Sequence, residues 1–142
     1  MKKFTYLIVA AAIVIAVILA LPSQPKPEKI IAFHMTLADP KLYSNGIFTD
    51  VFEIQKGTYR FSFVPNGDSP QTLSIALKGA TVSFAEDFQL EGTAHDTGIS
   101  TYYTWDYLGQ KEIQVQEDQQ LQIVINPNGN LLGSVSVDLI KT

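Results

Sequence analysis

Two stretches of the chain, FSFVPNGDSPQTLSIAL (Phe61–Leu77) and IVINPNGNLLGSVSVDL (Ile123–Leu139), carry nearly the same pattern and decide the fold. When Phe61 is aligned with Ile123 and Leu77 with Leu139, the two stretches match without a gap, and both contain Pro-Asn-Gly at the same place. Proline ends a strand, and Asn-Gly tolerates the positive φ of a tight reversal. We therefore predict two β-meanders related by pseudo-symmetry. The alternative is that shared turn chemistry alone makes two unrelated hairpins look alike.

Apolar and polar residues alternate with a period of two over most of the chain after residue 29. Such alternation indicates strands with one buried and one solvated face. The predicted strands are Lys29–Met35, Phe48–Gln55, Thr58–Phe63, Leu73–Leu77, Thr81–Leu90, Ser100–Tyr107, Lys111–Gln116, Leu121–Ile125 and Val135–Leu139. The fold class expected is all-β: an antiparallel, jelly-roll-like β-sandwich of about eight or nine strands.

The N-terminal part is expected to lie outside this sandwich. Lys2 and Lys3 precede an apolar stretch over residues 4–21, and eighteen helical residues span about 27 Å, close to the thickness of a bilayer core. We expect residues 1–21 to form a transmembrane helix that anchors the protein. A cleaved signal peptide is the alternative. Residues 22–29 form a Pro-rich stalk, and residues 30–142 the β-sandwich ectodomain.

Charge places the domain outside the cytoplasm and excludes some partners. The two N-terminal lysines predict a cytoplasmic N-terminus for a single-pass protein of the cell membrane. Residues 30–142 carry six basic and thirteen acidic side chains, a net charge of −7. An acidic domain argues against nucleic acid as a partner. The chain has no cysteine, so it uses no disulfide and its core alone must hold the fold.

A family resemblance covers residues 48–79, with an echo at 111–140. The run DVFEIQKGTYRFSFVPNGDSPQTLSIALKG resembles the core of small extracytoplasmic β-sandwich modules, both the GOLD domains of p24-type cargo proteins and the PPC-type domains of secreted proteins. The shared features are an apolar alternation, Lys-Gly, Tyr-x-Phe-x-Phe, a polar turn and a second alternating strand. The resemblance implies a non-catalytic interaction or stabilising domain on a membrane stalk.

The densest aromatic stretch is TYYTWDYLG (Thr101–Gly109). In a strand, Tyr103, Trp105 and Tyr107 share one face, and Tyr102 lies on the other. Exposed aromatic side chains stack on sugar rings or accept a partner's apolar surface. These four residues are the candidate partner or sugar surface. The alternative is that Trp105 and its neighbours fill the core.

Two histidines suggest a second kind of site. His34 is followed by Met35, and His95 is followed by Asp96. Together, these side chains would suit copper or zinc if the two segments met in space. No pair of histidines has the local spacing of a metal motif, so the competing interpretation is one histidine on a strand face and one in a loop.

Oxygen ligands suggest a third kind of site. The turns hold Asn66 with Asp68 and Asn128 with Asn130, and such side chains could ligate a structural calcium ion. Asn and Asp also favour turns for backbone reasons alone, and both interpretations stay open. No other cofactor is expected.

The sequence contains no phosphate-binding loop, dinucleotide fingerprint or nucleophile motif, so we do not expect an enzyme. The function predicted is an accessory or stabilising subunit that binds another envelope or membrane protein and is attached to the membrane by residues 4–21. A carbohydrate-binding module, a periplasmic metal-binding protein and a pilin-like filament subunit are the alternatives. The pattern does not indicate an oligomeric state.

Overall fold

A computed structural model describes residues 22 and 24–142 of the chain. Within them the chain forms nine strands and one short 3₁₀ helix. The strands are β1 (Ile31–Leu37), β2 (Phe48–Ile54), β3 (Gly57–Pro65), β4 (Thr72–Lys78), β5 (Ser83–Asp96), β6 (Thr101–Leu108), β7 (Glu112–Val115), β8 (Gln119–Asn126) and β9 (Val135–Lys141), and the helix is η1 (Pro40–Leu42). The all-β prediction is confirmed.

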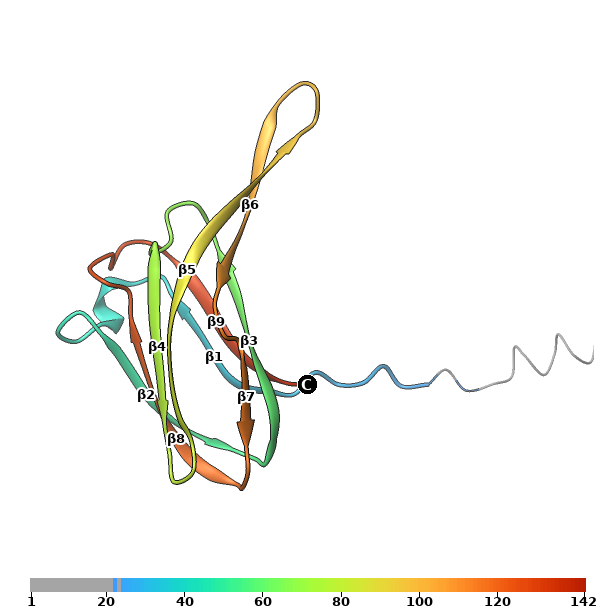
Figure 1. Ribbon diagram of the computed structural model, residues 1–142, viewed down its shortest axis with the longest axis vertical. Coiled ribbons are helices and arrows are strands. Elements are labelled where there is room, and N and C mark those ends of the chain that lie inside the picture. Colours follow the sequence, from blue (N-terminus) through green and yellow to red (C-terminus); the bar gives the residue numbers. More distant parts are fainter. Residues whose placement is uncertain (1–21, 23) are drawn as a thin grey trace, which may run out of the picture.

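The strands form two antiparallel sheets, one with the order β1-β9-β3-β7 and one with the order β2-β8-β4-β5-β6. The first part of the chain runs beside the last part in reverse: β1 pairs with β9, β2 with β8 and β3 with β7. This double ribbon passes from one sheet to the other at each step, which is the path of a jelly roll. The strand β6 is an addition at the edge of the five-stranded sheet (Figure 1).

The predicted pseudo-symmetry is present in the strand pairing. In the pair β3–β9, Phe61 lies opposite Leu139. In the pair β8–β4, Ile123 lies opposite Leu77. Ile123 is the repeat equivalent of Phe61, and Leu77 is the repeat equivalent of Leu139. A two-fold operation that exchanges the sheets therefore superimposes β3 on β8 and β9 on β4, with the same register.

The arrangement as two β-meanders was wrong. A meander keeps consecutive strands side by side in one sheet, whereas β3 and β4 lie in different sheets, and so do β8 and β9. The two Pro-Asn-Gly loops cross between the sheets. Period-two alternation specifies which side of a strand is buried, but it does not specify which strand lies next to it. Only the second copy adopts the predicted positive φ, at Asn128 (53°) and Gly129 (93°).

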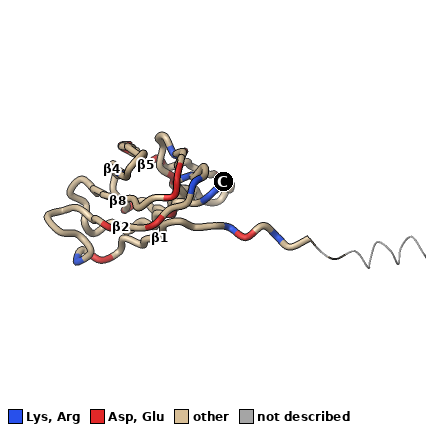
Figure 2. Tube along the Cα trace, turned by 90° about the horizontal axis from the view of Figure 1, so that it is seen from below, with Lys and Arg blue, Asp and Glu red and all other residues tan. Residues whose placement is uncertain are grey.

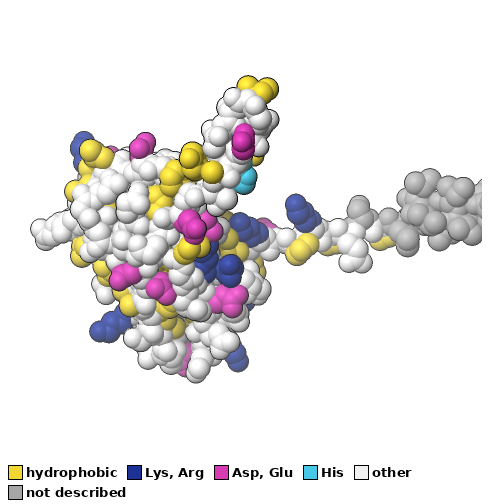
Figure 3. All heavy atoms as spheres, turned by 45° about the horizontal axis from the view of Figure 1, so that its top comes forward, with side chains coloured by type: hydrophobic (Ala, Val, Ile, Leu, Met, Phe, Trp, Pro, Cys, Tyr) yellow, Lys and Arg dark blue, Asp and Glu magenta, His cyan; other side chains and the backbone are white. Residues whose placement is uncertain are grey.

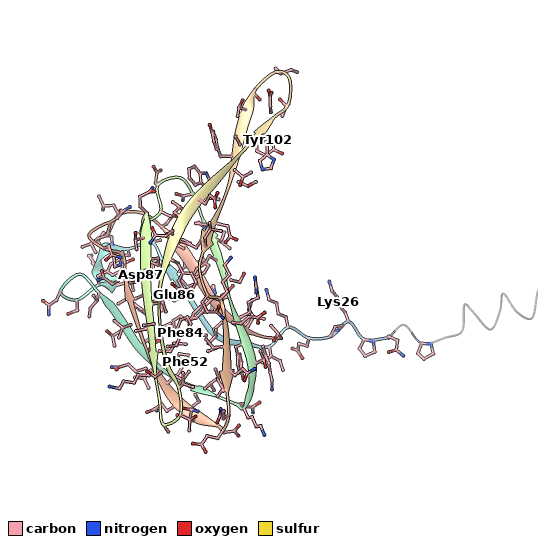
Figure 4. All side chains as sticks on the ribbon, in the orientation of Figure 1. Lys26, Phe52, Phe84, Glu86, Asp87 and Tyr102 are labelled. Atoms are coloured by element: carbon pink, nitrogen blue, oxygen red, sulfur yellow. The ribbon has the colours of Figure 1, made fainter. Side chains whose placement is uncertain are left out.

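Apolar side chains from both sheets meet in one core. Aromatic rings join the layers: the ring centre of Phe61 in β3 lies 5.7 Å from that of Phe84 in β5, and the ring centre of Phe33 in β1 lies 5.1 Å from that of Phe52 in β2 (Figure 4). The largest fully buried side chains are Tyr59, Tyr107, Phe61, Phe88, Leu37, Leu73, Ile75, Leu77, Leu121, Ile123, Ile125 and Leu139. Their burial is the main stabilising term of a domain without disulfides.

Residues 24–30, before β1, run away from the sandwich in an extended path (Figure 2). The predicted transmembrane helix falls on residues 1–21, which lie outside the described residues. Over residue 22 and residues 24–142, the structure contains no helix with the length and hydrophobicity of a membrane span.

One strand is much longer than predicted. The sequence favoured a strand ending at Leu90, whereas β5 continues to Asp96 and has 14 residues. The extension carries β5 and β6 beyond the rest of the sandwich (Figure 1). This projection positions most of the candidate aromatic residues.

Candidate functional site

A two-stranded arm projects from the five-stranded sheet, and we define it as residues 91–106. The pairing of β5 with β4 ends at Gln89, opposite Thr72. Beyond that point β5 pairs with β6 alone, from Glu91 opposite Asp106 to Asp96 opposite Thr101. Isolated two-stranded ribbons are only marginally stable in water, so the arm requires side-chain contacts of its own.

The tip of the arm is a tight turn held by side chains. The Thr97 amide donates to the Ser100 carbonyl (2.9 Å), and the Gly98 amide donates to Oδ1 of Asp96 (2.8 Å). Gly98 has a φ of 81°, a conformation that favours glycine. Ile99 projects from this turn with 98% of its surface exposed, and Figure 3 shows apolar side chains at the tip.

One face of the arm carries Tyr102 and His95. Their rings stack with centroids 4.8 Å apart, because the two residues lie directly opposite each other on β6 and β5. The imidazole Nε2 also lies 2.8 Å from the Thr104 hydroxyl oxygen. Tyr102 lies on the projecting arm (Figure 4) and remains 53% exposed, so its ring is accessible from solvent.

The opposite face carries Tyr103 and Trp105, whose ring centres lie 5.9 Å apart. The indole covers two glycines: a Cβ atom would lie 2.6 Å from it at Gly92 and 3.0 Å at Gly67. Gly92 is the cross-strand neighbour of Trp105, and Gly67 belongs to the loop between β3 and β4. The half-buried Trp105 therefore fixes the base of the arm, and Tyr103, 55% exposed, extends this apolar face outward.

The fourth aromatic candidate, Tyr107, is not part of a surface. Its side chain is fully buried, its ring centre lies 5.2 Å from that of Phe63, and its hydroxyl donates a hydrogen bond to the Pro70 carbonyl (2.6 Å). Burial raises the pKa of its phenol well above the ordinary value. The prediction of Tyr107 as a contact residue is corrected, because alternation along β6 continues from the arm into the core.

An open hollow of about 600 Å³ lies between the arm and β3. Thr93 and Thr104 line it from the arm, and Arg60 and Ser62 from β3. At its base Lys111 Nζ donates to Asp106 Oδ2 (2.8 Å) and lies 5.8 Å from the centre of the Phe63 ring. This ion pair braces the arm against the sandwich.

The structure does not bring the predicted metal ligands together. His34 lies on β1, where its Nδ1 is 2.5 Å from Oδ1 of Asp138, and Met35 packs against the core. His95 lies on β5 of the other sheet, in a strand and not in the predicted loop. Asp96 accepts a hydrogen bond in the tip of the arm. Residue 22 and residues 24–142 contain no cluster of three or more His, Cys, Asp or Glu side chains suited to a metal.

The predicted calcium loops do lie side by side. Nδ2 of Asn130 donates to the Asp68 carbonyl (3.0 Å), and Nδ2 of Asn66 donates to the Ser134 hydroxyl (3.2 Å). Oδ1 of Asn130 accepts from the Gly133 amide, and Oδ1 of Asn66 from the Asp68 amide. Asn128 donates to the Thr72 carbonyl. These contacts brace the loops, and the structural calcium ion stays a prediction.

The sequence analysis missed the two glycines beneath Trp105 and the pairing of His95 with Tyr102. The Gly92 signal was available, because a glycine in a strand often marks a close approach by another group. The stacking of His95 on Tyr102 could not be predicted from the sequence, because it depends on the register of a hairpin whose first strand was predicted to end at Leu90.

No protein-family model, curated protein or solved structure matches this chain. The resemblance to GOLD-like and PPC-like modules stays a prediction.

Proposed function

We propose that this protein is a non-catalytic accessory subunit that binds another envelope or membrane protein through its arm. Residues 4–21 anchor it in the cell membrane, residues 22–29 form the stalk, and the β-sandwich stands on the extracytoplasmic side. The sandwich is the rigid support, and the arm is the part that reaches the partner.

The observation that carries this proposal is the exposure of aromatic and apolar side chains on the arm. Tyr102, Tyr103 and Ile99 are each more than half exposed, and all three belong to the projecting segment. Tyrosine supplies a large, rigid contact area that is half apolar and half polar, which is why it is enriched at protein interfaces. Apolar side chains on such a projection favour contact with another protein.

A carbohydrate-binding module is the second candidate, because it uses the same exposed tyrosines. Tyr102 and Tyr103 are neighbours in β6 and therefore point to opposite faces of the arm. A sugar-binding platform presents its rings on one side. A protein groove that receives the arm contacts both sides, so the arrangement favours a protein partner over a glycan.

The proposal is tested by photocrosslinking in native membranes. A photoreactive phenylalanine analogue replaces Tyr102 in the full-length protein, and the matched control places it at Val51, which is 48% exposed and lies on β2, away from the arm. We expect one dominant protein adduct from position 102 and none from position 51. Equal labelling at both positions, or no protein adduct at position 102, would contradict the proposal. An adduct that disappears when glycan is added would favour the carbohydrate-binding function.

A further inference from the structure

The outer edge of β6 has main-chain groups that no strand within the described part of the chain covers. The Tyr107 amide donates to its neighbour Asp106 (2.8 Å), and the Leu90 amide donates to the Gln71 carbonyl (2.8 Å). Leu90 and Tyr107 lie opposite each other, so their N–H groups point away from one another. Their pair therefore belongs to the non-hydrogen-bonded set of the ladder.

This orientation propagates along the arm. The register between β5 and β6 is unbroken from Leu90–Tyr107 to Asp96–Thr101, and main-chain direction alternates with each residue of a strand. The N–H and C=O groups of Thr101, Tyr103 and Trp105 therefore point to the open side of β6. This row of donors and acceptors is a template for another strand.

The other sheet edges carry the protection that natural proteins place on exposed strands. In β2, the Asp50 carboxylate accepts from the Val51 amide, and β2 also carries Glu53. The edge strand β7 has only four residues. The edge strand β1 has an irregular register between Ile31 and Phe33.

The outer edge of the arm has no such protection between Thr101 and Trp105. These five residues, Thr-Tyr-Tyr-Thr-Trp, are all strong strand formers and none is charged. The first carboxylate, that of Asp106, is already paired with Lys111. The β5 edge of the arm differs, because Glu91 and Asp96 would meet like charges if two copies paired there.

We propose that β6 pairs antiparallel with β6 of a second copy of this chain, about a two-fold axis at Tyr103 or Thr104. The two arms then form a four-stranded sheet. The uncharged edge is self-complementary: with the axis at Thr104, Tyr103 of each copy lies beside Trp105 of the other, and aromatic cross-strand pairs are stabilising. The projection of the arms keeps the two acidic sandwiches apart.

This inference goes beyond the proposed function, since pairing uses the edge of β6 and leaves its two faces to the partner. The side chains of Tyr102 and Tyr103 remain accessible in the paired arms. The dimer would therefore present two copies of the partner-binding surface.

Disulfide trapping tests the pairing, because the chain has no cysteine of its own. The full-length variants Thr104→Cys and Tyr103→Cys are oxidised mildly, one at a time. Opposite residues in an antiparallel pair have Cα atoms about 4.5–5.5 Å apart, within disulfide range. We expect the variant at the axis to form a covalent dimer. Thr93→Cys, exposed on β5 and away from the edge, is the control and should stay monomeric. No dimer at position 103 or 104, or an equal yield at position 93, would overturn the proposal.

Proline supplies a second test that does not depend on oxidation. Tyr103→Pro removes an amide that points outward, so the hydrogen bonds between β6 and β5 are retained. The two-fold axis repeats the loss, and we expect dimerisation to weaken about tenfold to a hundredfold, measured by analytical ultracentrifugation of the full-length protein. Tyr103→Phe keeps the amide and should dimerise like the native protein. Native protein that stays monomeric, or a proline variant that dimerises normally, would contradict edge pairing.

The proposed partner binding and the proposed pairing of β6 can be tested independently. Thr101→Pro removes another outward-pointing amide of β6 and keeps the side chains of Tyr102, Tyr103 and Ile99, so it should lose the dimer and still capture the partner in the crosslinking experiment. Loss of both together would overturn the separation of edge and faces. A native dimer without any captured partner would remove the proposed function and leave the pairing.

Discussion

The two halves of β5 share one strand but lie in different environments. From Ser83 to Gln89 the strand pairs with β4, and Phe88 is fully buried there, with its ring centre 4.9 Å from that of Phe63. From Glu91 onward only β6 supports it. The comparison teaches that one continuous strand can pass directly from the core of a sandwich into an exposed projecting arm.

The largest contrast is expected from truncation on the two sides of this boundary. Phe88→Ala should lower the free energy of unfolding by about 3–5 kcal/mol, because it removes a buried ring and leaves a cavity. Ile99→Ala at the tip should change it by less than about 0.5 kcal/mol. Urea unfolding of the full-length protein, followed by circular dichroism, measures both. Similar losses in the two variants would mean that the tip is packed and not exposed.

Two tyrosines with buried hydroxyl groups extend the comparison within the core. The Tyr107 hydroxyl donates to Pro70, so Tyr107→Phe leaves a buried carbonyl without that partner and should cost about 1–2 kcal/mol. The Tyr43 hydroxyl is buried and has no hydrogen-bond partner within the described residues, so Tyr43→Phe should leave stability equal or slightly higher. Parallel thermal melts of the two variants are the check, and a larger loss in Tyr43→Phe would contradict the assignment.

Alkaline pH should destabilise the fold through its buried tyrosines. Burial raises the pKa of Tyr43, Tyr59 and Tyr107, whereas tyrosines of the unfolded chain release their protons near pH 10. The folded state then binds more protons than the unfolded state above about pH 10, so the contribution of these tyrosines to stability is constant below that pH and falls above it. Tyr107→Phe should make this fall shallower. An identical slope in the native protein and the variant would contradict the buried phenol.

The smallest effect is expected at the base of the arm. Gly92→Ala places a Cβ atom against the indole of Trp105, the only tryptophan in the chain. The ring must shift, and its fluorescence should move to longer wavelength, with a loss of global stability below about 1 kcal/mol. Gly98→Asn, in open space at the tip and able to adopt positive φ, is the matched control and should leave the emission unchanged.

The sequence was sufficient for the repeating part of the fold. Alternation located all nine strands, and the constant spacing between the two copies of the repeat reproduces the register shared by β3–β9 and β8–β4. It could not show that the Pro-Asn-Gly loops cross between sheets, because burial patterns do not specify a neighbouring strand. The first copy of the repeat also departs from the predicted turn. Its glycine, Gly67, does not adopt a positive φ, and it instead leaves room for the indole of Trp105.

The candidate site was predicted in part. Three of the candidate residues lie on the arm: Tyr102, Tyr103 and Trp105. The arm itself was missed, because the sequence around Gly92, His95 and Asp96 predicted a loop between Leu90 and the next strand. Tertiary pairing with β6 overrides that local preference. Tyr107 was wrongly placed on the surface. The strand β6 runs from the arm into the sandwich, so the same alternation that exposes Tyr103 buries Tyr107.

Hydrogen exchange along β5 and β6 of the full-length protein tests the central claim most directly. The amides of Phe84, Glu86 and Phe88, which face β4, should exchange only with global unfolding. The amides of Glu91, Thr93 and His95, which face β6, should be protected far less, because the arm opens locally. Equal protection of these two sets of amides would contradict the account, since it would show that the arm is an integral part of the sandwich and not a projecting element.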